Sequence, residues 1–204
     1  MQIIAHRINT SKELLRIPKD WGVEIDLRAA GSELILNHDP FKGGERFADY
    51  LTEYQHGLLV LNIKEAGIES EVLRLVRARG VREFFLLDVE FPYLYRASRQ
   101  GERAIAVRYS EDEPIELALR YKGKVDWVWI DTISHLPLSL KSVEQLRGYK
   151  TCLVCPERWG RPQEISEYRR AMAGINFQPD AVMTTRGHDL EWPTRQRKQR
   201  QSTR

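Results

Sequence analysis

The stretch QIIAHR (residues 2–7) runs from apolar residues directly into a histidine and an arginine, His6 and Arg7. Two later stretches share this feature: GVEIDLR (22–28) carries two acidic residues, and ELILNH (33–38) ends on a histidine. Short apolar runs bounded by turn-forming residues are typical of β-strands. Polar, chemically active side chains therefore gather at the ends of predicted strands.

Eight strand-like runs recur at intervals of roughly 25 residues. Amphipathic stretches lie between them, such as IESEVLRLVRARG (68–80), which ends in glycine, a residue that commonly terminates helices. This alternation predicts an α/β fold, a small (β/α)8 TIM barrel with a short β-hairpin extension (33–38) after strand two. An open doubly wound sheet is the rival fold, but the glycine-rich turn expected after its first strand is missing. The runs are QIIAHR (2–7), GVEIDLR (22–28), GLLVLNIK (57–64), EFFLLDVE (83–90), RAIAVRY (103–109), VDWVWID (125–131), KTCLVCPE (150–157) and DAVMTTR (180–186).

The length of 204 residues suits one domain, which we place at 1–192, followed by a basic tail at 193–204 that we expect to be disordered. The tail carries five basic residues and no acidic one, and removing them from the formal charge of +3 leaves −2. A solvated terminus is favoured over a polyanion-binding tail, because salt screens a few such charges.

No apolar stretch is long enough to span a membrane, and the first residues read as a strand rather than a signal peptide. We therefore expect a cytoplasmic protein. The two cysteines, Cys152 and Cys155, lie inside an apolar run, which favours buried thiols over a zinc site or a redox pair.

Glu24 and Asp26 are two residues apart on one predicted strand, so their side chains share a face. If that face points into the barrel, the two carboxylates repel each other unless a cation joins them, and a hard divalent ion, Mg²⁺ or Ca²⁺, suits oxygen ligands. The alternative is an edge strand with both acids in water.

Further polar residues accompany this acidic pair: His6, Arg7, His38, Asn62, Lys64 and Asp88. A metal, two histidines and two fixed cations match the needs of phosphoryl transfer. The metal polarises a phosphoryl oxygen, the cations neutralise charge on the others, and the histidines move protons.

The ordered segments IIAHR, GVEIDLR, LNHDP and LNIK resemble the glycerophosphodiester phosphodiesterase family, within the phosphatidylinositol-phospholipase-C-like superfamily. The segments FFLLDVEFP, AVRYSEDEP, VDWVWID and CLVCPERWGR are similar to a compact bacterial branch of that superfamily. The resemblance covers the chain to about Trp192 and rests on the ordered set of motifs.

The resemblance implies a role for each matching residue. His6 and His38 would be the acid/base pair, Arg7 would bind phosphate, and Lys64 would contact phosphate or transition-state charge. Glu24 and Asp26 would bind the metal, and Asp39 would orient its loop.

Two departures from the family pattern stand out. The acid of the family's third strand motif is Asn62 here, so we expect Asp88 on the next strand to restore the missing charge at the metal. Only FKGGERF (41–47) follows Pro40, where larger members have a long insertion, which implies an open, shallow pocket.

Residues of the later strands form a second group of candidates for substrate binding: Arg108, Trp129, Asp131 and Glu157. Arg108 could bind an anionic group or pair with the SEDE segment that follows it. Trp127 and Trp129 share a face with Asp131, which either lines the barrel or packs against helices. Glu157 could accept hydrogen bonds from a polyol or cap the next loop.

The predicted function is therefore a metal-dependent phosphodiester hydrolase that acts on a glycerophosphodiester-like or sugar-linked substrate. Attack by water and attack by a neighbouring substrate hydroxyl, which gives a cyclic phosphate, both stay open. The alternative is a slow or inactive barrel that serves as a binding or regulatory module. We expect a small-molecule partner, no nucleic acid and no stable membrane insertion, and the sequence carries no signal for the oligomeric state.

Overall fold

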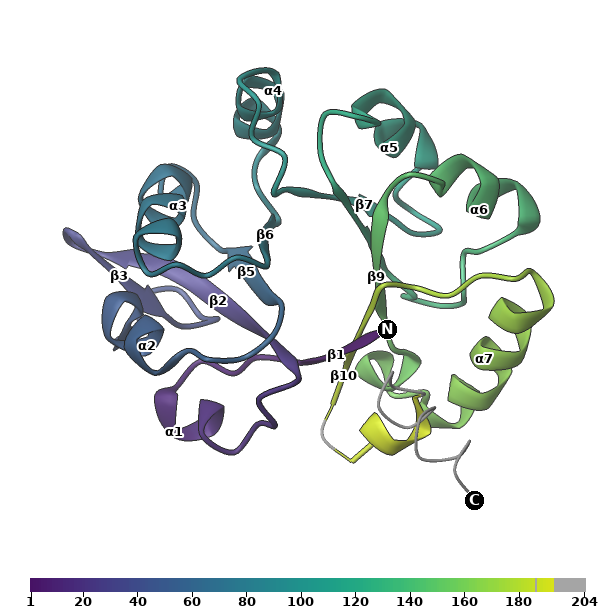
Figure 1. Ribbon diagram of the computed structural model, residues 1–204, viewed down its shortest axis with the longest axis horizontal. Coiled ribbons are helices and arrows are strands. Elements are labelled where there is room, and N and C mark those ends of the chain that lie inside the picture. Colours follow the sequence, from purple (N-terminus) through teal and green to yellow (C-terminus); the bar gives the residue numbers. More distant parts are fainter. Residues whose placement is uncertain (186, 193–204) are drawn as a thin grey trace. The chain divides into compact units, whose positions relative to one another are not determined.

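The computed structural model describes residues 1–185 and 187–192, which form a mixed α/β fold (Figure 1). The chain forms two compact units. The N-terminal unit is Ala5–Ile105, and the C-terminal unit combines Met1–Ile4 with the described residues from Ala106 onward. The predicted tail at 193–204 lies outside the described residues, and the assignment of 1–192 to one domain stays a prediction.

Each of the eight predicted runs contains a strand, so the prediction of alternating strands and helices is confirmed. Closure of these strands into a barrel stays a prediction.

The N-terminal unit is built on a sheet in the order β4-β3-β2-β5-β6. The parallel strands are β2 (Gly22–Ala30), β5 (Leu59–Ile63) and β6 (Phe84–Leu87), and the antiparallel ones are β3 (Glu33–Leu36) and β4 (Glu45–Arg46). Its helices are α1 (Ser11–Leu14), α2 (Phe47–Glu53), α3 (Glu69–Ala78) and α4 (Phe91–Arg99). The predicted hairpin after strand two is confirmed as the β2–β3 pair, with α2 packed beside it (Figure 1).

The C-terminal unit carries the strand order β1-β10-β9-β8-β7. These strands are β1 (Gln2–Ala5), β7 (Ala106–Tyr109), β8 (Trp127–Ile130), β9 (Lys150–Val154) and β10 (Ala181–Thr184), and the last residue of β1 already belongs to the N-terminal unit. Its helices are α5 (Ile115–Tyr121), α6 (Leu140–Leu146) and α7 (Ile165–Gly174), with short 3-10 turns at Pro156–Trp159, Pro162–Glu164 and Asp189–Glu191.

Strand β2 is buried on both faces, which decides between the two readings of its acidic pair. Val23, Ile25 and Leu27 are fully buried on one face, and Glu24 and Asp26 are 2% and 0% exposed on the other. The strand also pairs with a neighbour on each side, β3 and β5. The alternative of an edge strand with both acids in water is therefore wrong.

The two cysteines agree with the prediction of buried thiols. Cys152 and Cys155 are free and buried, as expected, and burial raises the pKa of the Cys155 thiol. Among residues 1–185 and 187–192, no helix is long and apolar enough to cross a membrane.

The connection that follows β3 depends on a glycine at position 44. A Cβ atom at Gly44 would lie 2.2 Å from the backbone oxygen of Leu36, whereas one at Gly43 would meet nothing within 4 Å. We expect Gly44→Ala to lower the free energy of unfolding by about 2 kcal/mol or more, because backbone atoms must move apart. Urea unfolding measures this, with Gly43→Ala as the matched control. Equal stability of the two variants would contradict a close approach of Gly44 to the Leu36 backbone.

Candidate functional site

The buried carboxylate of Glu24 lies where strand β2 faces the residues that follow β1. Its Oε2 accepts a hydrogen bond from the backbone N–H of Arg7 (2.8 Å), and its Oε1 accepts one from Asn62 Nδ2 (2.9 Å). Burial, and next the nearby charge of Asp26, raise the pKa of Glu24 to about 7. A carboxylate held so close to another needs a cation to be fully ionised at neutral pH.

Asp26 is fully buried and is held from three directions. Asn9 forms a two-way clamp, because its Nδ2 donates to Asp26 Oδ2 and its Oδ1 accepts from the Asp26 backbone N–H, both at 2.8 Å. Lys64 Nζ lies 3.3 Å from Asp26 Oδ1, and Arg7 Nε lies 4.0 Å from Oδ2. Two cations therefore share the charge of one buried acid.

The two candidate histidines have different surroundings. His6 Nε2 lies 3.9 Å from Glu24 Oε2, and the His6 side chain is largely buried. His38 is more open, and its Nδ1 lies 3.0 Å from Asp39 Oδ1. Asp39 also accepts a hydrogen bond from Lys42 Nζ, and these contacts lower the pKa of Asp39 to about 2. An ionised Asp39 orients the His38 ring through Nδ1, and Nε2 is the ring nitrogen that Asp39 does not contact.

Two residues at strand ends adopt left-handed backbone conformations that are rare outside glycine. Arg7 has φ +53° and Asp88 has φ +59°, and each follows a strand, β1 or β6, by one or two residues. Such conformations cost free energy and cluster at functional sites. Asp88 Oδ2 lies 3.9 Å from Lys64 Nζ, so Lys64 reaches both Asp26 and Asp88.

The structure brings together Glu24, Asp26, Asn62 and Lys64 with His6, Arg7 and Asp88, all within the N-terminal unit. Asp26 and Asn62 are direct register partners on the parallel strands β2 and β5. That pairing explains why strand-end residues distant in sequence meet at one place.

Sequence reasoning missed two residues of this region. Asn9 was overlooked because its clamp on Asp26 joins a loop to a strand. Arg28 was overlooked although it continues the Glu24 and Asp26 face of β2, a spacing of two that could have revealed it.

The oxygen atoms of this cluster suit a hard divalent cation only if the amide of Asn62 takes part. Within the part of the chain that the structure describes, no three His, Cys, Asp or Glu side chains are grouped for metal binding. Asn62 Oδ1 is buried and accepts no hydrogen bond, and Asp26 Oδ1 accepts none beyond its ion pair with Lys64. These oxygen atoms and the Glu24 carboxylate are of the type that Mg²⁺ or Ca²⁺ prefers, but Asn62 turns its Nδ2 toward Glu24, so binding of a cation by this set stays a prediction.

The second group of candidates lies in the C-terminal unit, at the ends of its parallel strands. Arg108 NH1 lies 3.1 Å from Asp131 Oδ2, and Arg108 Nε lies 3.7 Å from Glu113 Oε1, so it contacts both a strand-end acid and the SEDE segment. Asp131 Oδ1 also accepts a hydrogen bond from Trp159 Nε1 (2.9 Å), a partner that sequence reasoning missed.

Glu157 and Trp129 complete that group. Trp129 is buried. Glu157 Oε1 accepts hydrogen bonds from the Thr184 hydroxyl and from the backbone N–H of Thr185, so it fastens its own loop to the end of β10. Substrate binding by Arg108, Trp129, Asp131 and Glu157 stays a prediction.

Comparison with solved structures identifies the fold. The chain is similar to a glycerophosphoryl diester phosphodiesterase from Parabacteroides distasonis ATCC 8503, with a TM-score of 0.64 and 10% identity over 93% of this chain and 84% of that one. It is also similar to a glycerophosphodiester phosphodiesterase from Agrobacterium tumefaciens str. C58, with a TM-score of 0.63 and 15% identity over 94% and 99% of the two chains. No protein-family model and no curated protein matches the sequence. The shared fold agrees with the resemblance drawn from the sequence motifs.

Proposed function

We propose that the protein is a phosphodiester hydrolase of the glycerophosphodiester phosphodiesterase family, built on a small (β/α)8 barrel. The observation that carries this proposal is the fully buried pair Glu24 and Asp26, which meets Lys64, Arg7 and His6 at one strand end. Isolated buried carboxylates are costly, and their retention beside several cations is typical of a functional site. The fold shared with glycerophosphoryl diester phosphodiesterases supports the same reaction class.

Glu24, Asp26 and the amide oxygen of Asn62 would hold one divalent cation, Mg²⁺ or Ca²⁺. Bound there, the cation supplies Lewis-acid polarisation of a phosphoryl oxygen and lowers the pKa of a hydroxyl. We place Asp88 at the same site as the acid that replaces the family's third carboxylate. Its distance of 3.9 Å from Lys64 Nζ puts its carboxylate near the group that also contacts Asp26.

The remaining residues bind phosphate and move protons. Arg7 and Lys64 neutralise charge on the non-bridging oxygens, which grows as the nucleophile attacks. His6 and His38 serve as the general base and the general acid. Asp39 accepts a hydrogen bond from Nδ1–H of His38, so Nε2 is the nitrogen that takes up or gives the transferred proton. Either attack breaks one P–O ester bond, and the alcohol that leaves takes a proton from the general acid. Attack by water gives a phosphomonoester, and attack by a neighbouring substrate hydroxyl gives a cyclic phosphate.

The test is hydrolysis of a panel of glycerophosphodiesters and one chromogenic phosphodiester with Mg²⁺, Ca²⁺ or EDTA, for the wild type and His6→Ala. We expect turnover that depends on the metal and falls about 10²–10⁴-fold in the variant. Phosphorus NMR of the products separates the two routes. Turnover that persists in EDTA, or that is equal in His6→Ala, would contradict the mechanism.

Replacing Asp88 with asparagine tests its place at the metal. We expect weaker binding of the cation, because the site loses one negative charge while the side chain keeps its shape. Calorimetric titration of the metal-free protein measures the affinity. Asp112→Asn, in the C-terminal unit, is the control and should bind as the wild type does. An unchanged affinity in Asp88→Asn would remove Asp88 from the site.

One contact favours a second candidate function, a slow or inactive barrel that binds a ligand. Lys64 Nζ lies 3.3 Å from Asp26 Oδ1, so an internal cation already neutralises the carboxylate that should bind the metal. Binding of a phosphodiester without turnover in the hydrolysis panel would favour this candidate.

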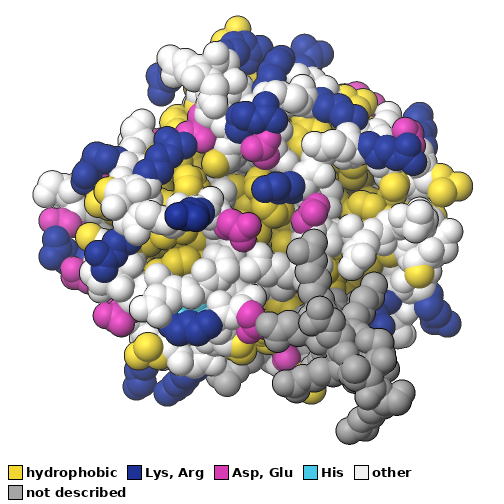
Figure 2. All heavy atoms as spheres, viewed as in Figure 1, with side chains coloured by type: hydrophobic (Ala, Val, Ile, Leu, Met, Phe, Trp, Pro, Cys, Tyr) yellow, Lys and Arg dark blue, Asp and Glu magenta, His cyan; other side chains and the backbone are white. Residues whose placement is uncertain are grey.

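The face of the molecule drawn in Figure 2 agrees with a small-molecule partner. On the face drawn in Figure 2, lysine and arginine side chains are interspersed with acidic ones and do not form one basic patch. Binding to nucleic acid depends on clustered positive charge. We therefore propose a small phosphodiester as the substrate.

A further inference from the structure

Arg28 joins the two segments that carry His38 and Lys64. It lies on β2, two residues beyond Asp26 and on the same face as the acidic pair. Its Nε and NH2 donate to the backbone oxygen of His38 at 3.3 and 3.0 Å, and its NH1 donates to the backbone oxygen of Lys64 at 3.0 Å. One guanidinium therefore binds the main chain of two proposed catalytic residues that lie 26 positions apart in sequence.

Neighbouring residues of β2 also hold the same two segments, through backbone hydrogen bonds. The backbone N–H of Lys64 donates to Leu27 O at 3.0 Å, so both backbone polar groups of Lys64 are bound by consecutive residues of β2. The backbone N–H of Asn37 donates to Asp26 O at 3.1 Å, next to the carbonyl of His38 that Arg28 holds. Among these hydrogen bonds between β2 and the two segments, those of Arg28 are made by a side chain and the others by the backbone.

The chemistry of this contact requires an arginine. The planar guanidinium presents several N–H groups in fixed directions, so it can reach two carbonyls on different loops at once. A lysine at position 28 would keep the positive charge but could not reproduce this fork. Proton transfer and phosphate contact are sensitive to displacements of about 1 Å.

We propose that Arg28 is a positioning residue, which sets the distance between the His38 acid/base group and the Lys64 cation by holding both backbones. This inference rests on the proposed function. Arg28 acts through His38 and Lys64 and has no proton to transfer, because a guanidinium stays charged. Its loss affects the geometry of the reacting groups and leaves substrate affinity nearly unchanged.

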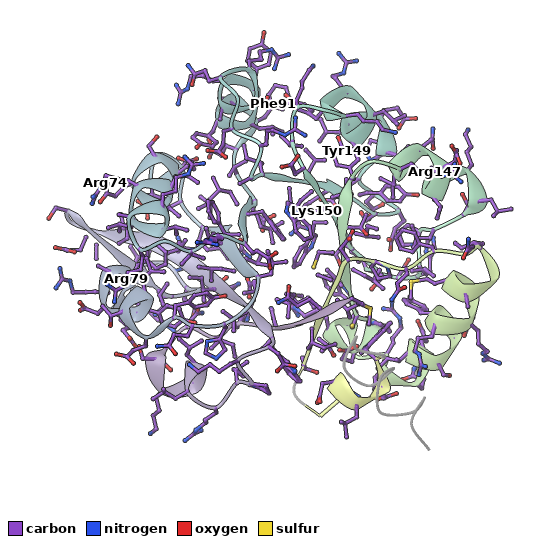
Figure 3. The ribbon with its side chains drawn as sticks, in the orientation of Figure 1. Arg74, Arg79, Phe91, Arg147, Tyr149 and Lys150 are labelled. Atoms are coloured by element: carbon purple, nitrogen blue, oxygen red, sulfur yellow. The ribbon has the colours of Figure 1, made fainter. Side chains whose placement is uncertain are left out.

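The experiment compares Arg28→Lys with Arg79→Lys, both as full-length protein. Arg79, labelled in Figure 3, is a matched control, because its Nε donates to a backbone carbonyl of helix α2, Leu51 O at 3.1 Å, and not to a segment that carries a proposed catalytic residue. The first measurement uses metal-free protein: the ring resonances of His38, assigned with His38→Gln, and the hydrogen exchange of the Lys64 amide. The second measures kcat and KM on whichever substrate of the panel the wild type cleaves.

We expect Arg28→Lys to shift the His38 resonances, speed exchange at Lys64 and lower kcat about 10–100-fold, with KM changed less than about twofold. Arg79→Lys should do none of these. Unchanged resonances and exchange in Arg28→Lys, or a loss confined to KM, would overturn the inference. If the wild type cleaves no substrate, the proposed function fails, and the NMR and exchange data alone still decide whether Arg28 holds the two segments.

Discussion

Replacing Lys64 with methionine is expected to lower the free energy of unfolding of the metal-free protein by about 3 kcal/mol. Lys64 Nζ lies 3.3 Å from Asp26 Oδ1, and the two side chains are only 18% and 0% exposed. Methionine fills similar space but leaves Asp26 with Asn9 and the more distant Arg7 as partners. A buried carboxylate that loses its nearest cation is strongly destabilising.

The double variant Asp26→Asn/Lys64→Met isolates the charge effect. Removing both charges should recover most of the lost stability, because no uncompensated ion remains in the core. Urea unfolding in EDTA measures the wild type, Lys64→Met and the double variant. If the double variant is as unstable as Lys64→Met, the loss of stability comes from packing and not from an uncompensated charge.

An exposed ion pair of similar length provides the control. Lys42 Nζ lies 2.8 Å from Asp39 Oδ2, and these side chains are 64% and 51% exposed. Water already solvates both charges, so Lys42→Met should leave the unfolding midpoint nearly unchanged. The contrast between the two lysines tests burial as the cause.

The strands of the eight runs could be predicted from sequence because their residues are mostly buried and read as apolar runs. The acidic pair could be predicted for the same reason, since Glu24 and Asp26 interrupt such a run at a spacing of two. The two-residue strand β4, Glu45–Arg46, has no apolar residue and was not predicted. The hairpin after β2 followed from its turn sequence and is confirmed. These are local signals, and each is contained within one element and its turn.

The contacts that organise the site were not predictable, because they join loops to strands. The clamp of Asn9 on Asp26 and the fork of Arg28 depend on loop backbones whose paths no periodicity encodes. The hydrogen bond from Trp159 to Asp131 spans 28 positions between a turn and a strand end. Long-range side-chain contacts of this kind require the tertiary structure.

Replacing Glu24 with glutamine should separate stability from activity. In the metal-free protein the pKa of Glu24 is about 7, so a neutral side chain at this position resembles a form the wild type already populates. Rotation of the Asn62 amide would let its unpartnered Oδ1 accept from the new glutamine, which keeps the buried groups paired. We therefore expect an unfolding free energy in EDTA at or above that of the wild type.

The same substitution should abolish metal-dependent turnover, by about 10³-fold or more, because the donor set loses a charged ligand. Titration with Mg²⁺ and Ca²⁺ measures the loss of binding, and the hydrolysis panel measures the loss of rate. Glu69→Gln is the matched control, since Glu69 is another buried glutamate of the N-terminal unit and accepts a hydrogen bond from Gly67 N at 2.8 Å. If Glu24→Gln binds the cation and turns over as Glu69→Gln does, the buried acid serves the fold alone, because only a ligand loses function when its charge is removed and its shape is kept.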